Sequence, residues 1–185
     1  MKIESIAVGL FAMWFLSEGL ILRTARDRSG SDVDRRSMLL LASSNLVAPL
    51  LSIALYFLGL GIAPFMPLLK AFGIVLMITG FVIRWAGMWT LKRFFSANVA
   101  VQSDHRLVIK GPYRMVRHPG YFGGWLAFVG FGLALGNWLA LILLAACTVP
   151  AFLYRIGVEE GILRSAFPYY AQYAARVRKF VPFVW

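Results

Sequence analysis

The chain has 185 residues, a length that suits one domain, and 60% of them are hydrophobic, with a mean hydropathy of +0.73. This composition excludes an ordinary soluble domain, because the apolar residues also occur in long runs. The formal net charge is +11, but the 19 lysines and arginines lie almost entirely between the apolar runs. That distribution is typical of membrane topology and argues against a basic nucleic-acid-binding face.

Five apolar stretches are predicted to form helices. The first three are long enough to cross a bilayer, since a span needs roughly 20 residues. The last two are short, and we expect them to form a tight helical hairpin that turns at Gly136-Asn137. In chain order, the stretches are residues 3–22, 38–62, 67–91, about 121–136 and about 138–154. The sequence therefore predicts an all-α integral membrane protein with about five transmembrane helices.

The distribution of basic residues predicts the orientation of these helices. The segments 23–37, 92–120 and 155–185 hold five, six and five lysines and arginines, whereas the opposite side holds only Lys2. Basic residues accumulate on the cytoplasmic side of membrane proteins. We therefore expect a multi-pass protein of the cell membrane, with the N-terminus outside and the C-terminus in the cytoplasm.

Several polar and small residues inside the apolar runs have structural explanations. Cys147 has no cysteine partner and belongs to no His/Cys cluster, so we expect a small buried side chain, no disulfide and no metal site. Glu18 and Arg84 could snorkel or pair, and we favour snorkelling. Gly130, Gly132 and Gly136 predict close helix packing, because no strand precedes them as a nucleotide-binding loop would require.

The segment 102–121, QSDHRLVIKGPYRMVRHPGY, is the first candidate for chemistry. Pro119-Gly120 would begin the fourth helix, where free backbone N–H groups and the helix dipole favour an anionic group. The side chains of His105, Tyr113, His118 and Tyr121 supply hydrogen-bonding and stacking groups. The alternative is a basic interfacial loop whose arginines and lysines contact lipid phosphates.

The second candidate is the sequence RIGVEEGIL, which begins at Arg155. Arg155 and Glu159 are four residues apart, so on a helix they share a face with Leu163. A cation and a carboxylate would then reach one pocket just below the membrane. The alternative is an ordinary surface ion pair, which contributes little to stability.

Both segments, in this order and on either side of a short helical hairpin, resemble the isoprenylcysteine carboxyl methyltransferase family, part of a wider group with the phospholipid methyltransferases. The resemblance covers about residues 98 to 182. It rests on GPYRMVRHPGY from Gly111, on the RxxxEExxL pattern from Arg155, and on the tail FPYYAQY from Phe167 followed by RKFVP from Arg178.

The resemblance implies an enzyme that transfers a methyl group from S-adenosylmethionine to the carboxylate of an isoprenylcysteine-like or other lipophilic acceptor at the cytoplasmic membrane face. Arg155 would be the catalytic residue that holds the acceptor carboxylate, and Glu159 would bind the amino group of the cofactor. The other residues that would contact the cofactor are Gln102, His105, Arg106, Leu107, Val108, Tyr113, His118, Pro119, Gly120 and Tyr121.

The resemblance also implies two regions: N-terminal transmembrane helices in residues 1–91, and a methyltransferase core in residues 92–185 with a cofactor loop, the hairpin and a cytoplasmic C-terminal helix. The tail departs from the family pattern. Pro168 stands where glycine is usual, and Tyr170 and Tyr173 come one residue early. We therefore assign no role to these tyrosines.

Four other functions stay open on the sequence. A phospholipid amine N-methyltransferase would need a base, because its acceptor amine is protonated at pH 7, and a thiol acceptor is a further alternative. Membrane sterol reductases that use NADPH share the C-terminal shape, but they are longer, and this chain shows no extra site for a 2′-phosphate. A non-enzymatic transporter or scaffold would predict internal repeats, and we find none. The identity of the acceptor and the oligomeric state stay undetermined.

Overall fold

The computed structural model describes residues 2–24, 32–63, 66–95 and 107–182, and the regular elements in these ranges are all helices. Five long helices form a bundle, and one short helix follows them. The helices are α1 (Ile3–Thr24), α2 (Asp32–Phe57), α3 (Pro67–Leu91), α4 (Pro119–Leu135), α5 (Trp138–Ala166) and α6 (Tyr170–Arg176), with short 3-10 turns at η1 (Lys92–Phe94) and η2 (Gly111–Arg114). The prediction of an all-α protein is confirmed.

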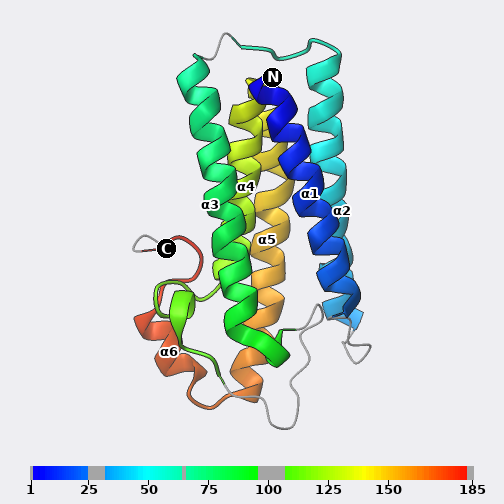
Figure 1. The fold of residues 1–185 in the computed structure, drawn as a ribbon. Coiled ribbons are helices and arrows are strands. Elements are labelled where there is room, and N and C mark those ends of the chain that lie inside the picture. Colours follow the sequence, from blue (N-terminus) through cyan, green and yellow to red (C-terminus); the bar gives the residue numbers. More distant parts are fainter. Residues whose placement is uncertain (1, 25–31, 64–65, 96–106, 183–185) are drawn as a thin grey trace.

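The axes of the five long helices are roughly parallel to one another, and consecutive helices run in opposite directions (Figure 1). The start of α1 lies at one end of the bundle, and α6 lies at the other. Aromatic side chains fill the interior between α1 and α4. The rings of Phe11 and Phe131 stack with centroids 4.5 Å apart, and Trp14 meets Phe128 edge-on at 5.8 Å. These four side chains are almost completely buried, so they form the centre of the core.

Four helices, α1, α2, α3 and α5, are long and apolar enough to cross a membrane. Their outer faces carry large apolar side chains, such as Leu16, Leu39 and Trp89, which are about 70% exposed. Such surfaces suit contact with lipid rather than water. The chain is therefore an integral membrane protein. α4 is shorter, with 17 residues, and the count of five crossings stays a prediction.

Glycines bring α3 and α4 into backbone contact. A Cβ added to Gly80 would lie 2.4 Å from the carbonyl oxygen of Gly123, and one added to Gly130 would lie 2.5 Å from that of Gly73. No larger side chain fits at such distances. The predicted packing role of Gly130 is therefore confirmed: its neighbours on α3 are Gly73 and Met77, and Gly80, seven residues after Gly73, makes the equivalent contact with Gly123.

The turn between α4 and α5 lies at Gly136-Asn137, where the sequence predicted it. Gly136 has a φ of 64°, in the left-handed region that favours glycine. The side chain of Asn137 accepts a hydrogen bond from the backbone N–H of Ala140 (2.9 Å) and donates one to the carbonyl of Leu60 (2.7 Å). Asn137 therefore caps the start of α5 and fixes the segment that follows α2 to the turn.

α5 is longer than the sequence predicted. The apolar stretch was expected to end near Tyr154, but the helix continues without interruption to Ala166 and has 29 residues. It ends where Phe167 adopts an extended conformation before Pro168, because a residue that precedes proline disfavours the helical region. Arg155 and Glu159 consequently lie on a continuous helix and not on a separate turn after it.

Glu18 and Arg84 form an ion pair, so the preference for snorkelling was wrong. The Nε and Nη2 atoms of Arg84 donate to the two carboxylate oxygens of Glu18 at 2.6 and 2.5 Å. Both side chains lie between helices, where a charge that reached neither water nor a partner would cost several kcal/mol. Pairing across α1 and α3 satisfies both charges in a two-pronged geometry.

Candidate active site

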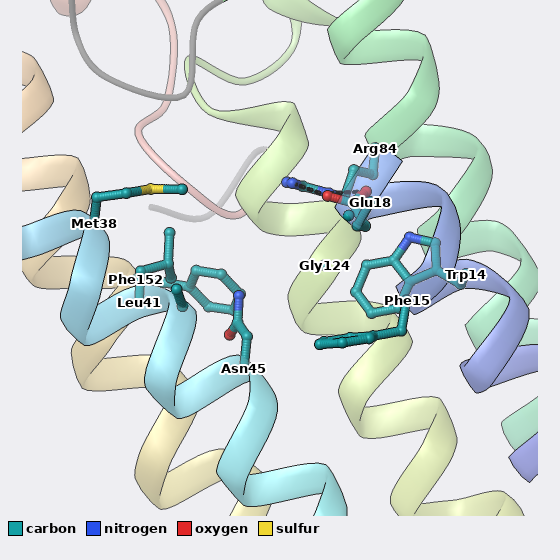
Figure 2. Close-up of a pocket in the computed structure, with 11 residues that line it drawn as sticks. Trp14, Phe15, Glu18, Met38, Leu41, Asn45, Arg84, Gly124 and Phe152 are labelled. Carbon is teal, nitrogen blue, oxygen red and sulfur yellow. Dashed lines mark hydrogen bonds and ion pairs between the residues drawn. The ribbon is translucent and has the colours of Figure 1, made fainter. Parts of the chain in front are cut away.

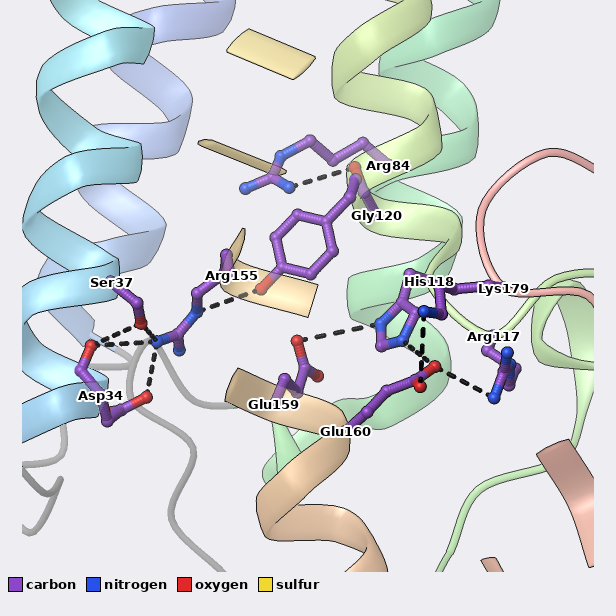
Figure 3. Close-up of polar contacts among 11 residues, drawn as sticks. Asp34, Ser37, Arg84, Arg117, His118, Gly120, Arg155, Glu159, Glu160 and Lys179 are labelled. Carbon is purple, nitrogen blue, oxygen red and sulfur yellow. Dashed lines mark hydrogen bonds and ion pairs between the residues drawn. The ribbon is translucent and has the colours of Figure 1, made fainter. Parts of the chain in front are cut away.

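The two predicted motifs meet where α4 begins, beside the second half of α5 (Figure 3). His118 occupies the N-cap position of α4, and Tyr121 lies in its first turn. Arg155 and Glu159 lie one turn apart on α5 and face these two residues. Residues separated by more than 30 positions in the sequence thus form one cluster of polar side chains.

Tyr121 connects the two motifs. Its ring lies against that of His118, with centroids 5.8 Å apart, and its hydroxyl oxygen lies 3.4 Å from Nε of Arg155. Glu159 also approaches His118, with 3.8 Å between Oε2 and Nδ1. The predicted proximity of Arg155, His118 and Glu159 is therefore observed.

Arg155 is 2% exposed and is held by the first turn of α2. Its Nη1 atom donates to the carboxylate of Asp34 (2.5 Å), to the backbone carbonyl of Asp34 (3.1 Å) and to the hydroxyl of Ser37 (2.7 Å). These contacts were not predictable from the sequence, because Asp34 and Ser37 precede the predicted core by more than 50 residues. In the sequence, Asp34 and Ser37 are three positions apart and would share a helix face, and this spacing was the only indication that they act together.

The adjacent residues Glu159 and Glu160 have different surroundings. The side chain of Glu160 is 6% exposed and contacts Arg117 (3.0 Å) and Nε2 of His118 (3.2 Å). Arg164 and Lys179 lie farther from it, at 3.6 and 4.0 Å. Glu159 is 26% exposed, and its described ion-pair partner is His118 at 3.8 Å. Glu160 therefore neutralises basic groups of the protein, whereas Glu159 is the more accessible carboxylate.

The C-terminal tail closes one side of the cluster. The hydroxyl of Tyr173 donates to the backbone carbonyl of Tyr113 (2.7 Å), and the N–H of Arg117 donates to the carbonyl of Arg178 (2.8 Å). Burial raises the pKa of Tyr113, of Tyr170 and of Tyr173 above the usual value for a phenol. These phenols therefore stay neutral at physiological pH, and Tyr173 positions the 111–114 turn.

The remaining predicted cofactor residues have different places. Pro119 is buried at the start of α4, and Gly120 accepts a hydrogen bond from Nη1 of Arg84 (3.2 Å), so these two residues pack against α3. Leu107 and Val108 are half-buried in the segment that leads to the 111–114 turn. The other three, Gln102, His105 and Arg106, lie outside the described residues.

A pocket opens between the helices on the membrane side of the cluster (Figure 2). It has a cavity volume of about 130 Å³ and is lined mainly by apolar side chains, among them Leu41 and Phe152, together with the Glu18–Arg84 pair. Phe152 precedes Arg155 by one turn of α5, so the pocket lies about one helical turn from the position of Arg155. Two polar atoms of lining residues, Nε1 of Trp14 and Oδ1 of Asn45, are buried without a hydrogen-bond partner among the described residues.

A family model described as phospholipid methyltransferase matches residues 68–169, from α3 through the cluster to the residues just after α5. The chain belongs to this family. Members of the isoprenylcysteine branch are among its relatives. Protein-S-isoprenylcysteine O-methyltransferase B of Arabidopsis thaliana is 34% identical over 116 residues, which cover 61% of this chain and 59% of the relative. The corresponding enzyme of Schizosaccharomyces pombe is 34% identical over 105 residues, which cover 55% of this chain and 44% of the relative.

One family relative carries a different name. The cobalt-zinc-cadmium resistance protein CzcN of Cupriavidus metallidurans is 29% identical over 116 residues, which cover 54% of each chain. Among solved structures, a eukaryotic intramembrane Ras methyltransferase, isoprenylcysteine carboxyl methyltransferase, is similar with a TM-score of 0.63 and 29% identity. That match covers 75% of this chain and 52% of the solved one. The matched part of the chain thus spans 44% to 59% of the length of these proteins.

Proposed function

We propose that this chain is a methyltransferase that uses S-adenosylmethionine to methylate the carboxylate of a lipophilic acceptor. The observation that carries the proposal is the position of Arg155 and Glu159, one turn apart on α5, with Arg155 next to Tyr121 and Glu159 next to His118. A buried cation suits a carboxylate acceptor, and the more accessible carboxylate suits a cationic cofactor. The isoprenylcysteine O-methyltransferases among the relatives support this assignment.

The residues present fit the cofactor in charge. When bound, S-adenosylmethionine supplies an electrophilic methyl group on a positively charged sulfonium. Glu159 is the carboxylate that would bind its amino group, because Glu160 is already surrounded by Arg117, His118 and Lys179. The neutral phenol of Tyr113 and the ring of His118 would line the same side. The roles predicted for Gln102, His105 and Arg106 remain part of the proposal.

Arg155 would orient the acceptor. Its guanidinium is planar and offers paired N–H donors to a carboxylate. The pocket near Arg155 is lined mainly by apolar side chains, as small-molecule sites usually are, and it would receive the hydrocarbon part of the acceptor from the membrane. The carboxylate of the acceptor would thereby lie in the polar cluster, and its hydrocarbon part would lie in the neighbouring apolar pocket.

The chemistry needs no general base. A carboxylate is already ionised at pH 7, because its reference pKa is about 4. His118 accordingly need not remove a proton, and its Nε2 is engaged with Glu160 at 3.2 Å. The contribution of the protein would be alignment and the exclusion of water, to which the buried rings of His118 and Phe152 contribute.

We place the site at the cytoplasmic face, with the N-terminus outside. Lys70 lies near the start of α3 and pairs with Glu4 (2.5 Å), so it adds a second basic residue to the end predicted to lie outside. The excess of basic residues at the end that holds the site is still large. This orientation also gives a soluble cofactor direct access from the cytosol.

A phospholipid amine is the second candidate acceptor, because the matching family model carries that description. The amine would have to lose a proton before it could attack. Methyl transfer would then rise steeply with pH below the pKa of the amine. Transfer to a carboxylate would be almost independent of pH between about 6 and 8, since the acceptor is ionised throughout that range.

Transfer of labelled methyl groups tests the proposal. The purified chain in lipid nanodiscs would be supplied with labelled S-adenosylmethionine and, separately, with a farnesylcysteine derivative, a fatty acid, phosphatidylethanolamine or a lipophilic thiol. The proposal expects label in a carboxylate acceptor, in a form that alkali releases as an ester would. Label confined to phosphatidylethanolamine, and resistant to alkali, would assign the second candidate instead.

A further inference from the structure

Asp34 places a second carboxylate on the arginine that the proposed function assigns to the acceptor. We propose that Asp34 sets the affinity and selectivity of the acceptor site by neutralising Arg155 from the opposite side. This inference rests on the proposed function, because it concerns how Arg155 meets an acceptor. It also extends the site to α2, which lies before the part of the chain that the family model matches.

The contacts at Nη1 of Arg155 are complete. This nitrogen carries two hydrogens, and three oxygens surround it: the Asp34 carboxylate, the Asp34 carbonyl and the Ser37 hydroxyl, at 2.5, 3.1 and 2.7 Å. The Ser37 hydroxyl donates to the Asp34 carbonyl (2.8 Å), so it uses its lone pair for Arg155 and its hydrogen for the backbone. The arrangement is satisfied without any further ligand at Nη1.

Asp34 is a fixed partner and not a displaceable one. Its side chain is completely buried, and its own backbone carbonyl also contacts Arg155. An acceptor carboxylate would therefore approach the guanidinium from the side of Tyr121, where Nε lies 3.4 Å from the phenol oxygen. Figure 3 shows Asp34 and Ser37 together beside the guanidinium of Arg155, whereas Tyr121 contacts its Nε atom.

The charge balance predicts weak binding of the acceptor. Arg155 and Asp34 together carry no net charge, so an incoming carboxylate meets the dipole of an ion pair and not an uncompensated cation. Weak attraction is useful here, since a tightly held carboxylate would be stabilised in the ground state and would attack less readily. Asp34 would thus favour turnover at the expense of acceptor affinity.

Asp34→Asn tests this role, because the amide keeps the shape and the oxygen that faces Arg155 but removes the charge. Ser37→Ala is the matched control, since it removes another oxygen from the same Nη1 atom without changing any charge. Binding of N-acetyl-S-farnesylcysteine and of its carboxamide would be measured on the full chain in nanodiscs, without methyl donor. Binding of the same two ligands would also be measured on Asp34→Ser, which removes the charge of Asp34 with a different side chain.

We expect Asp34→Asn to bind the acid about tenfold more tightly, because the incoming carboxylate then meets a guanidinium that Asp34 no longer neutralises, with the attraction screened at an effective dielectric constant of about 20. The carboxamide should bind as to the parent, and Ser37→Ala should change both affinities by less than about twofold. In turnover with the acid, both KM and kcat should fall in Asp34→Asn. A merely structural role would not lower KM.

Equal changes for acid and carboxamide, or weaker binding of the acid, would overturn the inference and reduce Asp34 to a link between α2 and α5. The binding ratio is measured without methyl transfer, so it is separate from the proposed function. If no carboxylate is methylated, the proposed function fails. If carboxylates are methylated but the acid-to-carboxamide ratio does not rise, only the role of Asp34 fails.

Discussion

Nε of Arg155 on α5 lies 3.4 Å from the hydroxyl oxygen of Tyr121 on α4. This contact joins the segment before α4 to the helix that carries the arginine and glutamates. It also means that the guanidinium is held from two sides, since Asp34 and Ser37 bind its Nη1 atom. A substitution of Arg155 therefore also changes the surroundings of the buried Asp34 carboxylate, and the two residues have to be replaced together.

Replacement of Arg155 by alanine alone should destabilise the protein by about 3–5 kcal/mol, because it leaves the buried Asp34 carboxylate without its cation. The double variant Arg155→Met with Asp34→Asn removes both charges and should stay folded. We expect its methyl transfer to fall by about 10²-fold or more, while its affinity for S-adenosylhomocysteine changes by less than about threefold. Steady-state assays and calorimetric titration measure the two effects.

Arg164→Ala is the control for that double variant. Arg164 lies on the same helix, but its side chain is 58% exposed, so its loss should leave turnover within about twofold. Equal losses of turnover and of S-adenosylhomocysteine affinity in the double variant would contradict the division of roles between Arg155 and Glu159.

The neighbouring glutamates should respond differently to loss of charge. Glu159→Gln should weaken S-adenosylhomocysteine binding by about tenfold or more, because a charge-assisted hydrogen bond is worth about 1.5–3 kcal/mol, and it should leave thermal stability nearly unchanged. Glu160→Gln should instead lower the thermal midpoint, since Glu160 is the buried partner of Arg117 and His118. Titration and thermal unfolding on both variants decide the matter; a larger loss of affinity in Glu160→Gln would reassign the cofactor carboxylate.

The pocket between the helices predicts where the acceptor tail lies. Ala42 is an exposed residue of α2 that lines this pocket, so Ala42→Trp should obstruct it. We expect KM for a farnesylated acceptor to rise by about tenfold, as loss of one or two buried hydrophobic groups implies, with S-adenosylhomocysteine affinity unchanged. Ala54→Trp is the control, because Ala54 is exposed on the same helix outside the described lining. Identical KM values for the two variants would place the tail elsewhere.

The backbone contact between α3 and α4 predicts a strong effect of one methyl group. Gly80→Ala should destabilise the protein by about 1–3 kcal/mol or more, because its Cβ would lie 2.4 Å from the carbonyl oxygen of Gly123. Gly9→Ala in α1 meets no atom within 4 Å and should be neutral or slightly stabilising. Thermal unfolding in matched detergent compares the two, and an equal shift in both variants would show that the approach of α3 to α4 can relax.

Much of the fold could be predicted because hydrophobic runs and turn residues act locally. The apolar runs indicated the membrane helices, and Gly136-Asn137 indicated the turn before α5. The end of α5 could not be placed from hydropathy, because residues after Tyr154 change in polarity but keep their helical hydrogen bonds to Ala166. Helix ends depend on backbone geometry, here the proline after Phe167, more than on polarity.

The candidate site, like the fold, could be predicted from the sequence only in part. The sequence alone determined that Arg155 and Glu159 share a helix face and that His118 and Tyr121 lie at the start of the fourth helix, because these relations depend only on helical periodicity. Only the tertiary structure decided that Glu18 pairs with Arg84, that Glu160 is the neutralised carboxylate, and that Asp34 binds Arg155. Each of these pairs joins segments that are far apart along the chain, so it depends on how the helices and the segment before α4 pack together, which spacing along the sequence does not specify.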